Sequence, residues 1–126
     1  MNVFHYDSVE AKDAGPETSK VNIRWLIDEK IGAENFFMRM FEIEPEGYTP
    51  LHLHDWEHEV FILEGEGLVI CGDDARLFRP GDVIFISPDE KHQFRNTGKK
   101  LVKLLCLIPN KKGIEQPATS CSCQIK

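Results

Sequence analysis

The apolar residues of this chain fall into short runs rich in β-branched and aromatic side chains, beginning near Val21. The runs cover residues 21–27, 36–43, 59–63, 68–71, 83–87 and 101–108. Clusters of glycine, proline, asparagine and aspartate separate them, and predict turns at 44–47, 65–67, 72–74, 79–82, 87–90 and 96–98. Short strands at roughly ten-residue spacing, without sustained helical periodicity, are typical of a sandwich or barrel. The pattern therefore predicts an all-β fold.

The chain divides into three segments by composition. Residues 1–19 are polar and contain the breaker Gly15-Pro16, so we expect an N-terminal arm there. Residues 20–112 hold all the predicted strands, and 113–126 form a polar C-terminal tail. A chain of 126 residues can close one hydrophobic core but not two. We therefore expect a single β-barrel domain with an arm and a tail.

The strand predicted at 59–63 is apolar on both faces. Val60 and Ile62 would face one side of the sheet, whereas Phe61 and Leu63 would face the other. A strand that buries both faces needs a second layer, and a partner subunit is the most economical one. We therefore expect a homodimer.

Composition and charge exclude several classes of binding partner. Charged residues make up 29% of the chain and its net charge is −6, with no basic stripe, so we expect no nucleic-acid partner. No apolar run has the roughly 18 residues needed to cross a membrane, and no secretory signal is visible, so we expect a cytoplasmic protein. Its cysteines should then be reduced, including the pair in the polar tail. They are Cys71, Cys106, Cys121 and Cys123.

The histidines carry the candidate chemistry. His52, His54 and His58 fall within one seven-residue stretch, and His92 follows a predicted turn that leads into a later strand. Residues two apart on a strand share a face, so His52 and His54 should project together, and a short turn could return His58 to the same cavity. Neutral imidazole is the usual ligand of transition metals. A cluster of surface histidines is the alternative interpretation.

The stretch 46–96 resembles the two-motif core of the cupin superfamily. The first motif of that family places a glycine before His-x-His, followed by a glutamate and a second glycine; here it matches His52, His54, His58 and Gly65. The second motif matches 81–96, with His92 at the histidine position and Asn96 at its end. The resemblance implies a double-stranded β-helix (jelly roll) that binds one divalent metal ion.

The chain departs from the family pattern at three places. The opening glycine is displaced by one residue, from Glu46 to Gly47, and the turn at 87–89 reads Ser-Pro-Asp. Aspartate tolerates the left-handed backbone that such a turn needs. The third departure is chemical, because His58 occupies the position of the family's glutamate ligand. Glu59 is the competing candidate, but its parity points it away from the other ligands, so we favour His58.

A metal held by four neutral imidazoles keeps its full +2 charge, which favours an anionic ligand in the open positions. Calcium and magnesium are disfavoured, leaving Mn, Fe, Ni, Co, Cu or Zn, of which Mn or Fe is favoured. The remaining candidates for the pocket are Trp56, Phe94 and Cys106, for each of which ordinary packing is the simpler interpretation.

Similar cupins include metal-dependent dioxygenases, so the resemblance implies an oxygenase that acts on a small organic molecule. The alternatives are a non-enzymatic module that binds a sugar or organic acid, and a metal-dependent isomerase or lyase. The motif supplies no inward acid or base for proton transfer, which weakens the isomerase or lyase.

Overall fold

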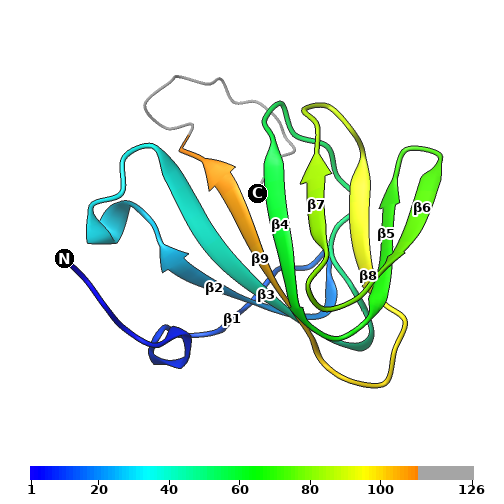
Figure 1. The fold of residues 1–126 in the computed structure, drawn as a ribbon, viewed down its shortest axis with the longest axis horizontal. Helices are drawn as coiled ribbons and strands as arrows, with labels where there is room; N and C mark the ends of the chain where they lie inside the picture. Colours follow the sequence, from blue (N-terminus) through cyan, green and yellow to red (C-terminus); the bar gives the residue numbers. More distant parts are fainter. Residues whose placement is uncertain (111–126) are drawn as a thin grey trace.

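The computed structural model describes residues 1–110, and Figure 1 shows their arrangement. Nine strands and two short 3₁₀ helices make up this part of the chain. In order they are η1 (Tyr6–Ser8), β1 (Lys12–Asp13), β2 (Ser19–Ile27), η2 (Glu29–Ile31), β3 (Phe36–Tyr48), β4 (His58–Glu64), β5 (Gly67–Cys71), β6 (Asp74–Phe78), β7 (Val83–Ile86), β8 (His92–Asn96) and β9 (Val102–Pro109). Across residues 1–110, no helix has the length and apolar character needed to span a membrane. The all-β prediction is confirmed.

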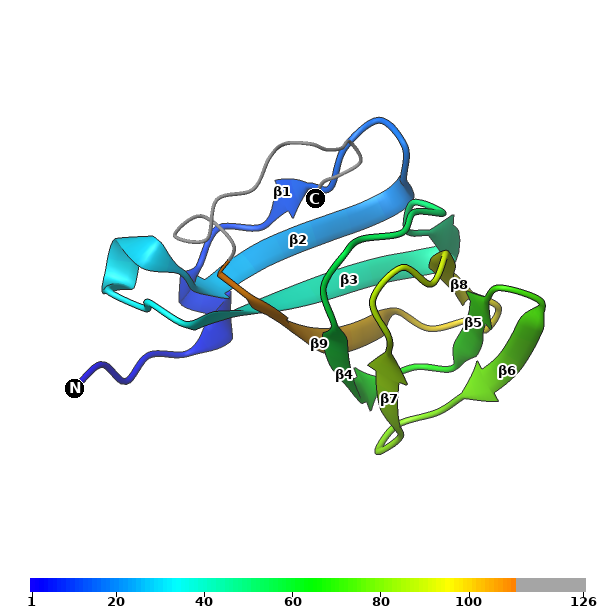
Figure 2. The same cartoon turned by 90° about the horizontal axis from the view of Figure 1, so that it is seen from above.

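The strands form one antiparallel sheet that curls into a half-barrel, as Figures 1 and 2 show. The order across the sheet is β6-β5-β8-β3-β9-β4-β7, with β2 on β3 and β1 on β2. The curl brings β8, β3, β9 and β4 around one interior, although they lie far apart in the sequence. Residues from distant parts of the chain can therefore meet inside it.

The six predicted strands all occur, and the main difference lies in β3. The predicted turn at 44–47 is wrong, because β3 continues to Tyr48. The pairing of β2 with β3 shifts register between Ser19 and Val21, and Glu46 has a φ of 72°. These features describe a bulge rather than a chain reversal. A Cβ atom on Gly47 would lie 2.6 Å from the carbonyl oxygen of Ser19, so only glycine fits there.

The expected alternation on β4 is confirmed. Val60 and Ile62 are 2% and 0% exposed, whereas Phe61 and Leu63 on the other face are 43% and 37% exposed. The buried face joins Ile43, Leu104 and other apolar side chains in one core. Burying each such side chain contributes about 1.5 to 3 kcal/mol, so this core fixes the strands that carry the histidines.

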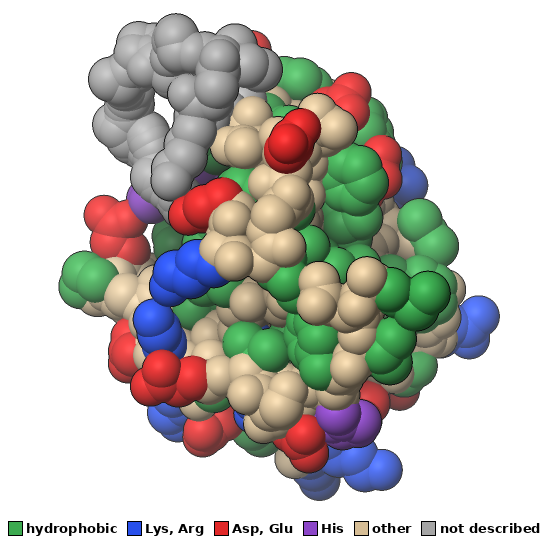
Figure 3. Space-filling view, turned by 90° about the vertical axis from the view of Figure 1, so that its left-hand side faces the viewer, with side chains coloured by type: hydrophobic (Ala, Val, Ile, Leu, Met, Phe, Trp, Pro, Cys, Tyr) green, Lys and Arg blue, Asp and Glu red, His purple; other side chains and the backbone are tan. Residues whose placement is uncertain are grey.

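The N-terminal segment contacts the barrel at two places. β1 pairs with β2, and the backbone NH of Ala14 donates to Val21 O at 3.0 Å. Nearer the terminus, Tyr6 Oη accepts a hydrogen bond from Lys103 Nζ at 2.8 Å. Figure 3 shows one face of the molecule, on which acidic and basic side chains lie among apolar ones. The predicted tail at 113–126, with Cys121 and Cys123, lies outside the described residues.

Candidate metal centre

Three separate segments bring the four histidines together. His52 and His54 lie in the connection between β3 and β4, and His58 and His92 are the first residues of β4 and β8. His52 and His92 form an isolated β-bridge, in which the His92 NH donates to His52 O at 2.9 Å and the His52 NH donates to His92 O at 3.2 Å. The connection is therefore tied directly to β8, although it is not the regular strand that the sequence predicts.

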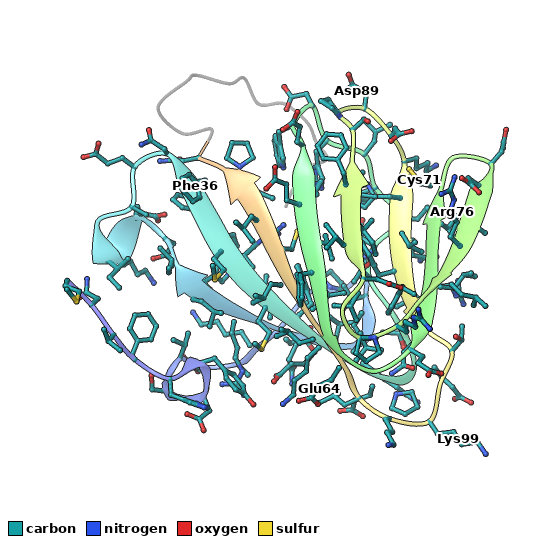
Figure 4. All side chains as sticks on the ribbon, viewed as in Figure 1. Phe36, Glu64, Cys71, Arg76, Asp89 and Lys99 are labelled. Atoms are coloured by element: carbon teal, nitrogen blue, oxygen red, sulfur yellow. The ribbon has the colours of Figure 1, made fainter. Side chains whose placement is uncertain are left out.

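The turn before β8 holds His54 in place. The backbone NH of Asp89 donates to His54 O at 2.6 Å, and Asp89 has a φ of 67°. This is the left-handed conformation that aspartate was expected to adopt in place of the family's glycine. Figure 4 shows Asp89 at the end of the barrel opposite Glu64 and Lys99. The two histidine segments therefore join at one end of the barrel.

The spacing of the imidazole rings suits ligands of one metal ion. The centroids of His58 and His92 lie 4.7 Å apart, those of His54 and His58 5.1 Å, those of His54 and His92 6.0 Å, and those of His52 and His54 6.1 Å. A metal–nitrogen distance of about 2.1 Å places the centroids of two ligands on one ion roughly 4.5 to 6.4 Å apart. These four centroid distances fall within that range.

The ring nitrogens of the four histidines are not arranged around one metal position in this structure. Among residues 1–110, no group of three or more His, Cys, Asp or Glu side chains could hold a metal ion as it stands. His52 provides a reason, because its Nε2 atom forms an ion pair with Glu17. Metal binding through His52 Nε2 would require either the imidazole or the Glu17 carboxylate to move within this contact.

The Nδ1 atoms of His92 and His58 each have a defined neighbour. His92 Nδ1 donates to the carbonyl oxygen of Glu90 at 2.9 Å, which leaves Nε2 as the metal-binding atom. Burial lowers the pKa of His92, opposed by this hydrogen bond, and the lower pKa favours the neutral ring that ligation requires. His58 Nδ1 lies 3.4 Å from Cys106 Sγ. Such partners orient a histidine ligand and tune its basicity.

A cavity of about 100 Å³ adjoins the rings. Its lining combines the four histidines with Arg39, Thr49 and Cys106, a set of apolar side chains from β2, β3, β8 and β9, and two residues of the N-terminal segment. Among residues 1–110, no carboxylate lines it. Since a water molecule takes about 30 Å³ of liquid, the cavity has roughly the volume of three waters. It suits an ion and the head group of a ligand rather than a large molecule.

Arg39 gives this cavity a positive charge. Its side chain is 5% exposed, and its Nη2 atom donates to Cys106 Sγ at 3.0 Å. The guanidinium also lies 5.0 Å from the ring centroid of Phe41 and 5.5 Å from that of Trp25. Its buried Nε atom has no hydrogen-bond partner within residues 1–110. A buried donor without a partner is costly, so this group is suited to an anionic ligand.

The other sequence candidates occupy different positions. Phe94 and Cys106 line the cavity, whereas Trp56 stacks on the His54 ring at 4.6 Å and borders a separate groove. Burial raises the pKa of the Cys106 thiol, and the charge of Arg39 opposes this. Glu59 is exposed, on the face of β4 opposite to the buried His58.

Arg39 and Glu17 also lie near the site. Arg39 alternates with apolar residues on a buried strand, and this parity is a usable signal for an inward charge. Glu17 had no such signal, because the polar composition of residues 1–19 predicts only an arm. Its place beside His52 depends on the tertiary structure.

Comparison with known proteins places this geometry in context. The cupin domain family matches residues 39–108. The chain is 32% identical over 71 residues to the 1-methylthio-D-xylulose 5-phosphate methylsulfurylase of Rhodospirillum rubrum, covering 56% of this chain and 46% of that protein. It is 34% identical over 73 residues to the oxalate-binding protein of Thermotoga maritima, covering 57% and 60%. The chain thus spans about half the length of the curated relatives it matches.

A solved structure matches over more of the chain. The polyketide cyclase RemF from Streptomyces resistomycificus superposes with a TM-score of 0.81 and 34% identity, covering 86% of this chain and 79% of that one. The predicted oxalate decarboxylase structure from Thermotoga maritima has a TM-score of 0.75 at 24% identity, which shows the shared fold alone.

Proposed function

Because the chain belongs to the cupin family, we propose that it is a metal-dependent enzyme that binds a small 1,3-dicarbonyl group as its enolate. The metal ligands in this proposal are His52, His54, His58 and His92. The likeness to a polyketide cyclase supports this substrate class, since poly-β-ketones consist of repeated 1,3-dicarbonyl units. The reaction we propose is the cyclisation of such a chain.

One observation carries the proposal: four imidazoles and the buried Arg39 meet in a cavity that no carboxylate lines. With a divalent ion bound, this pocket holds at least three positive charges. An enolate of a 1,3-dicarbonyl is a monoanion with two oxygens at chelating distance, so it gains more from this field than a neutral ligand would.

The bound ion and the side chains of the protein would contribute different parts of the chemistry. A divalent ion held by His52, His54, His58 and His92 would supply Lewis-acid polarisation of the dicarbonyl oxygens, which would acidify the carbon between them so that its proton passes to solvent water. Arg39 adds a fixed positive charge to the same cavity, where exclusion of water strengthens it. Cys106 and the Glu90 carbonyl hold two of the histidine rings through their Nδ1 atoms. The apolar lining, including Phe94 and Leu104, limits the entry of water.

The experiment uses pentane-2,4-dione, a small 1,3-dicarbonyl with an ultraviolet enolate band. Under nitrogen, the Zn²⁺-loaded protein should bind it and shift this band, whereas the metal-free protein should not. A short linear poly-β-ketone should then lose one molecule of water on cyclisation, as mass spectrometry would detect. Equal binding by metal-free and metal-loaded protein would contradict the proposal.

An oxygenase is the second candidate, because four histidines line the cavity and an ion held by four side chains keeps open positions that suit redox chemistry. Oxygen uptake separates the two functions. The iron- or manganese-loaded protein should consume oxygen with the dicarbonyl only if it is an oxygenase, whereas a cyclase forms its product under nitrogen.

A further inference from the structure

Glu17 contacts the candidate metal centre from outside the barrel. It lies in the connection between β1 and β2, and its carboxylate forms an ion pair with His52 Nε2. Its side chain is 63% exposed, so Glu17 stands at the boundary between the cavity and solvent.

The backbone around Glu17 is held by hydrogen bonds. The NH of Gly15 donates to the Asp13 carboxylate at 2.8 Å, and the Thr18 NH and hydroxyl donate to Gly15 O at 3.2 and 2.7 Å. Ala14 and Thr18, on either side of Glu17, line the same cavity as the histidines. This turn therefore covers part of the cavity and presents Glu17 at its edge.

The position of the carboxylate relates directly to the metal. His52 cannot shift as a whole, because two backbone hydrogen bonds join it to His92. A metal ion bound to His52 Nε2 would lie about 2.1 Å along the direction in which Nε2 now meets Glu17. The carboxylate must therefore either withdraw or bind the ion itself.

The positive charge of the site favours the second outcome, in which the Glu17 carboxylate binds the ion. The ion would carry +2 among neutral imidazoles, and the buried Arg39 adds another positive charge nearby. A carboxylate that moves away leaves this charge unbalanced, whereas one that stays offsets it. Carboxylate oxygen is also an accepted ligand of Mn, Fe, Co and Zn.

We propose that Glu17 is a fifth, exchangeable protein ligand of the metal, and that an anionic ligand binds by displacing it. This inference rests on the metal centre of the proposed function. The turn at 13–18 then acts as a cover whose carboxylate occupies an open metal position until an anion with stronger, chelating oxygens takes its place. Displacement frees the Glu17 carboxylate and opens this metal position to the incoming anion.

The test compares the full-length chain with Glu17→Gln and with the control Glu10→Gln, which removes an exposed carboxylate from the same N-terminal segment. Each protein is stripped of metal and titrated with Co²⁺ by calorimetry. Azide is then titrated into the Co²⁺-loaded protein and followed by visible absorption. Glu17→Gln should bind Co²⁺ about 10- to 100-fold more weakly, the loss typical of groups that support a metal site. It should bind azide more tightly, because no carboxylate has to leave.

The outcomes separate this inference from the proposed function. If the unmodified protein takes up Co²⁺ and Glu17→Gln matches it in both titrations, the ligand role of Glu17 is refuted while the four-histidine centre stands. Tighter Co²⁺ binding by Glu17→Gln would also refute it, since Glu17 would then only compete for His52. If the unmodified protein takes up no Co²⁺, both proposals fail. Glu10→Gln should behave as the unmodified protein does.

Discussion

Replacing Cys106 by alanine tests whether the interior of the barrel supports the candidate metal centre. The thiol accepts a hydrogen bond from Arg39 at 3.0 Å and lies 3.4 Å from His58 Nδ1. Cys106→Ala leaves a buried guanidinium without this acceptor, which costs about 1 to 3 kcal/mol of unfolding free energy. It also removes a neighbour of a histidine ligand, for which a loss of 10- to 100-fold in metal affinity is typical, or about 1.4 to 2.8 kcal/mol.

Two assays separate these effects. Urea unfolding of the metal-free protein measures the first loss, and calorimetric titration with Zn²⁺ measures the second. Cys106→Ser restores a polar atom at the same position and should recover most of both. Val102→Ala is the control for lost packing on the same strand, because that buried side chain of β9 is not among the residues that line the cavity. Unchanged Zn²⁺ affinity in Cys106→Ala would refute the idea that this thiol supports His58.

Three further predictions concern the ligands, the cavity charge and the outer face. His58→Ala should lose bound metal, whereas Glu59→Ala should retain it, as elemental analysis would show; the reverse result would refute the ligand assignment. Arg39→Met should weaken binding of pentane-2,4-dione to the metal-loaded protein at least tenfold while the metal affinity stays near normal, and equal binding by calorimetry would count against a role for its charge. The exposed side chains of Phe61 and Phe85, on the adjacent strands β4 and β7, should pack in the proposed homodimer. Replacing both by serine should convert the dimer to a monomer in light scattering, and a monomeric unmodified protein would overturn this proposal.

The strand pattern could be predicted because burial alternates along each strand. Val60 and Ile62 against Phe61 and Leu63 show this relation directly. The bulge near Gly47 could not, because Pro-Glu-Gly is also the composition of a turn. The distinction depends on the close approach of Ser19 from a neighbouring strand.

Part of the candidate site could likewise be predicted from the sequence, and part could not. The spacing of the histidines, together with its resemblance to the cupin motifs, predicted the set that the structure gathers at one end of the barrel, since motif spacing and strand parity are local properties. The neighbours of those histidines are not local. Cys106 reaches His58 across 48 positions of sequence, and Glu17 reaches His52 from a segment whose composition predicts only an arm. Such contacts follow from the curl of the sheet, which no single window of sequence encodes.

X-ray absorption spectroscopy at the zinc edge tests the central claim most directly. The protein, stripped of metal and loaded with one equivalent of Zn²⁺, should show imidazole scattering from four histidines with nitrogen at about 2.1 Å. The signal should fall by one imidazole in His58→Ala. A first shell of oxygen alone, or a spectrum unchanged in His58→Ala, would contradict a metal centre built from His52, His54, His58 and His92.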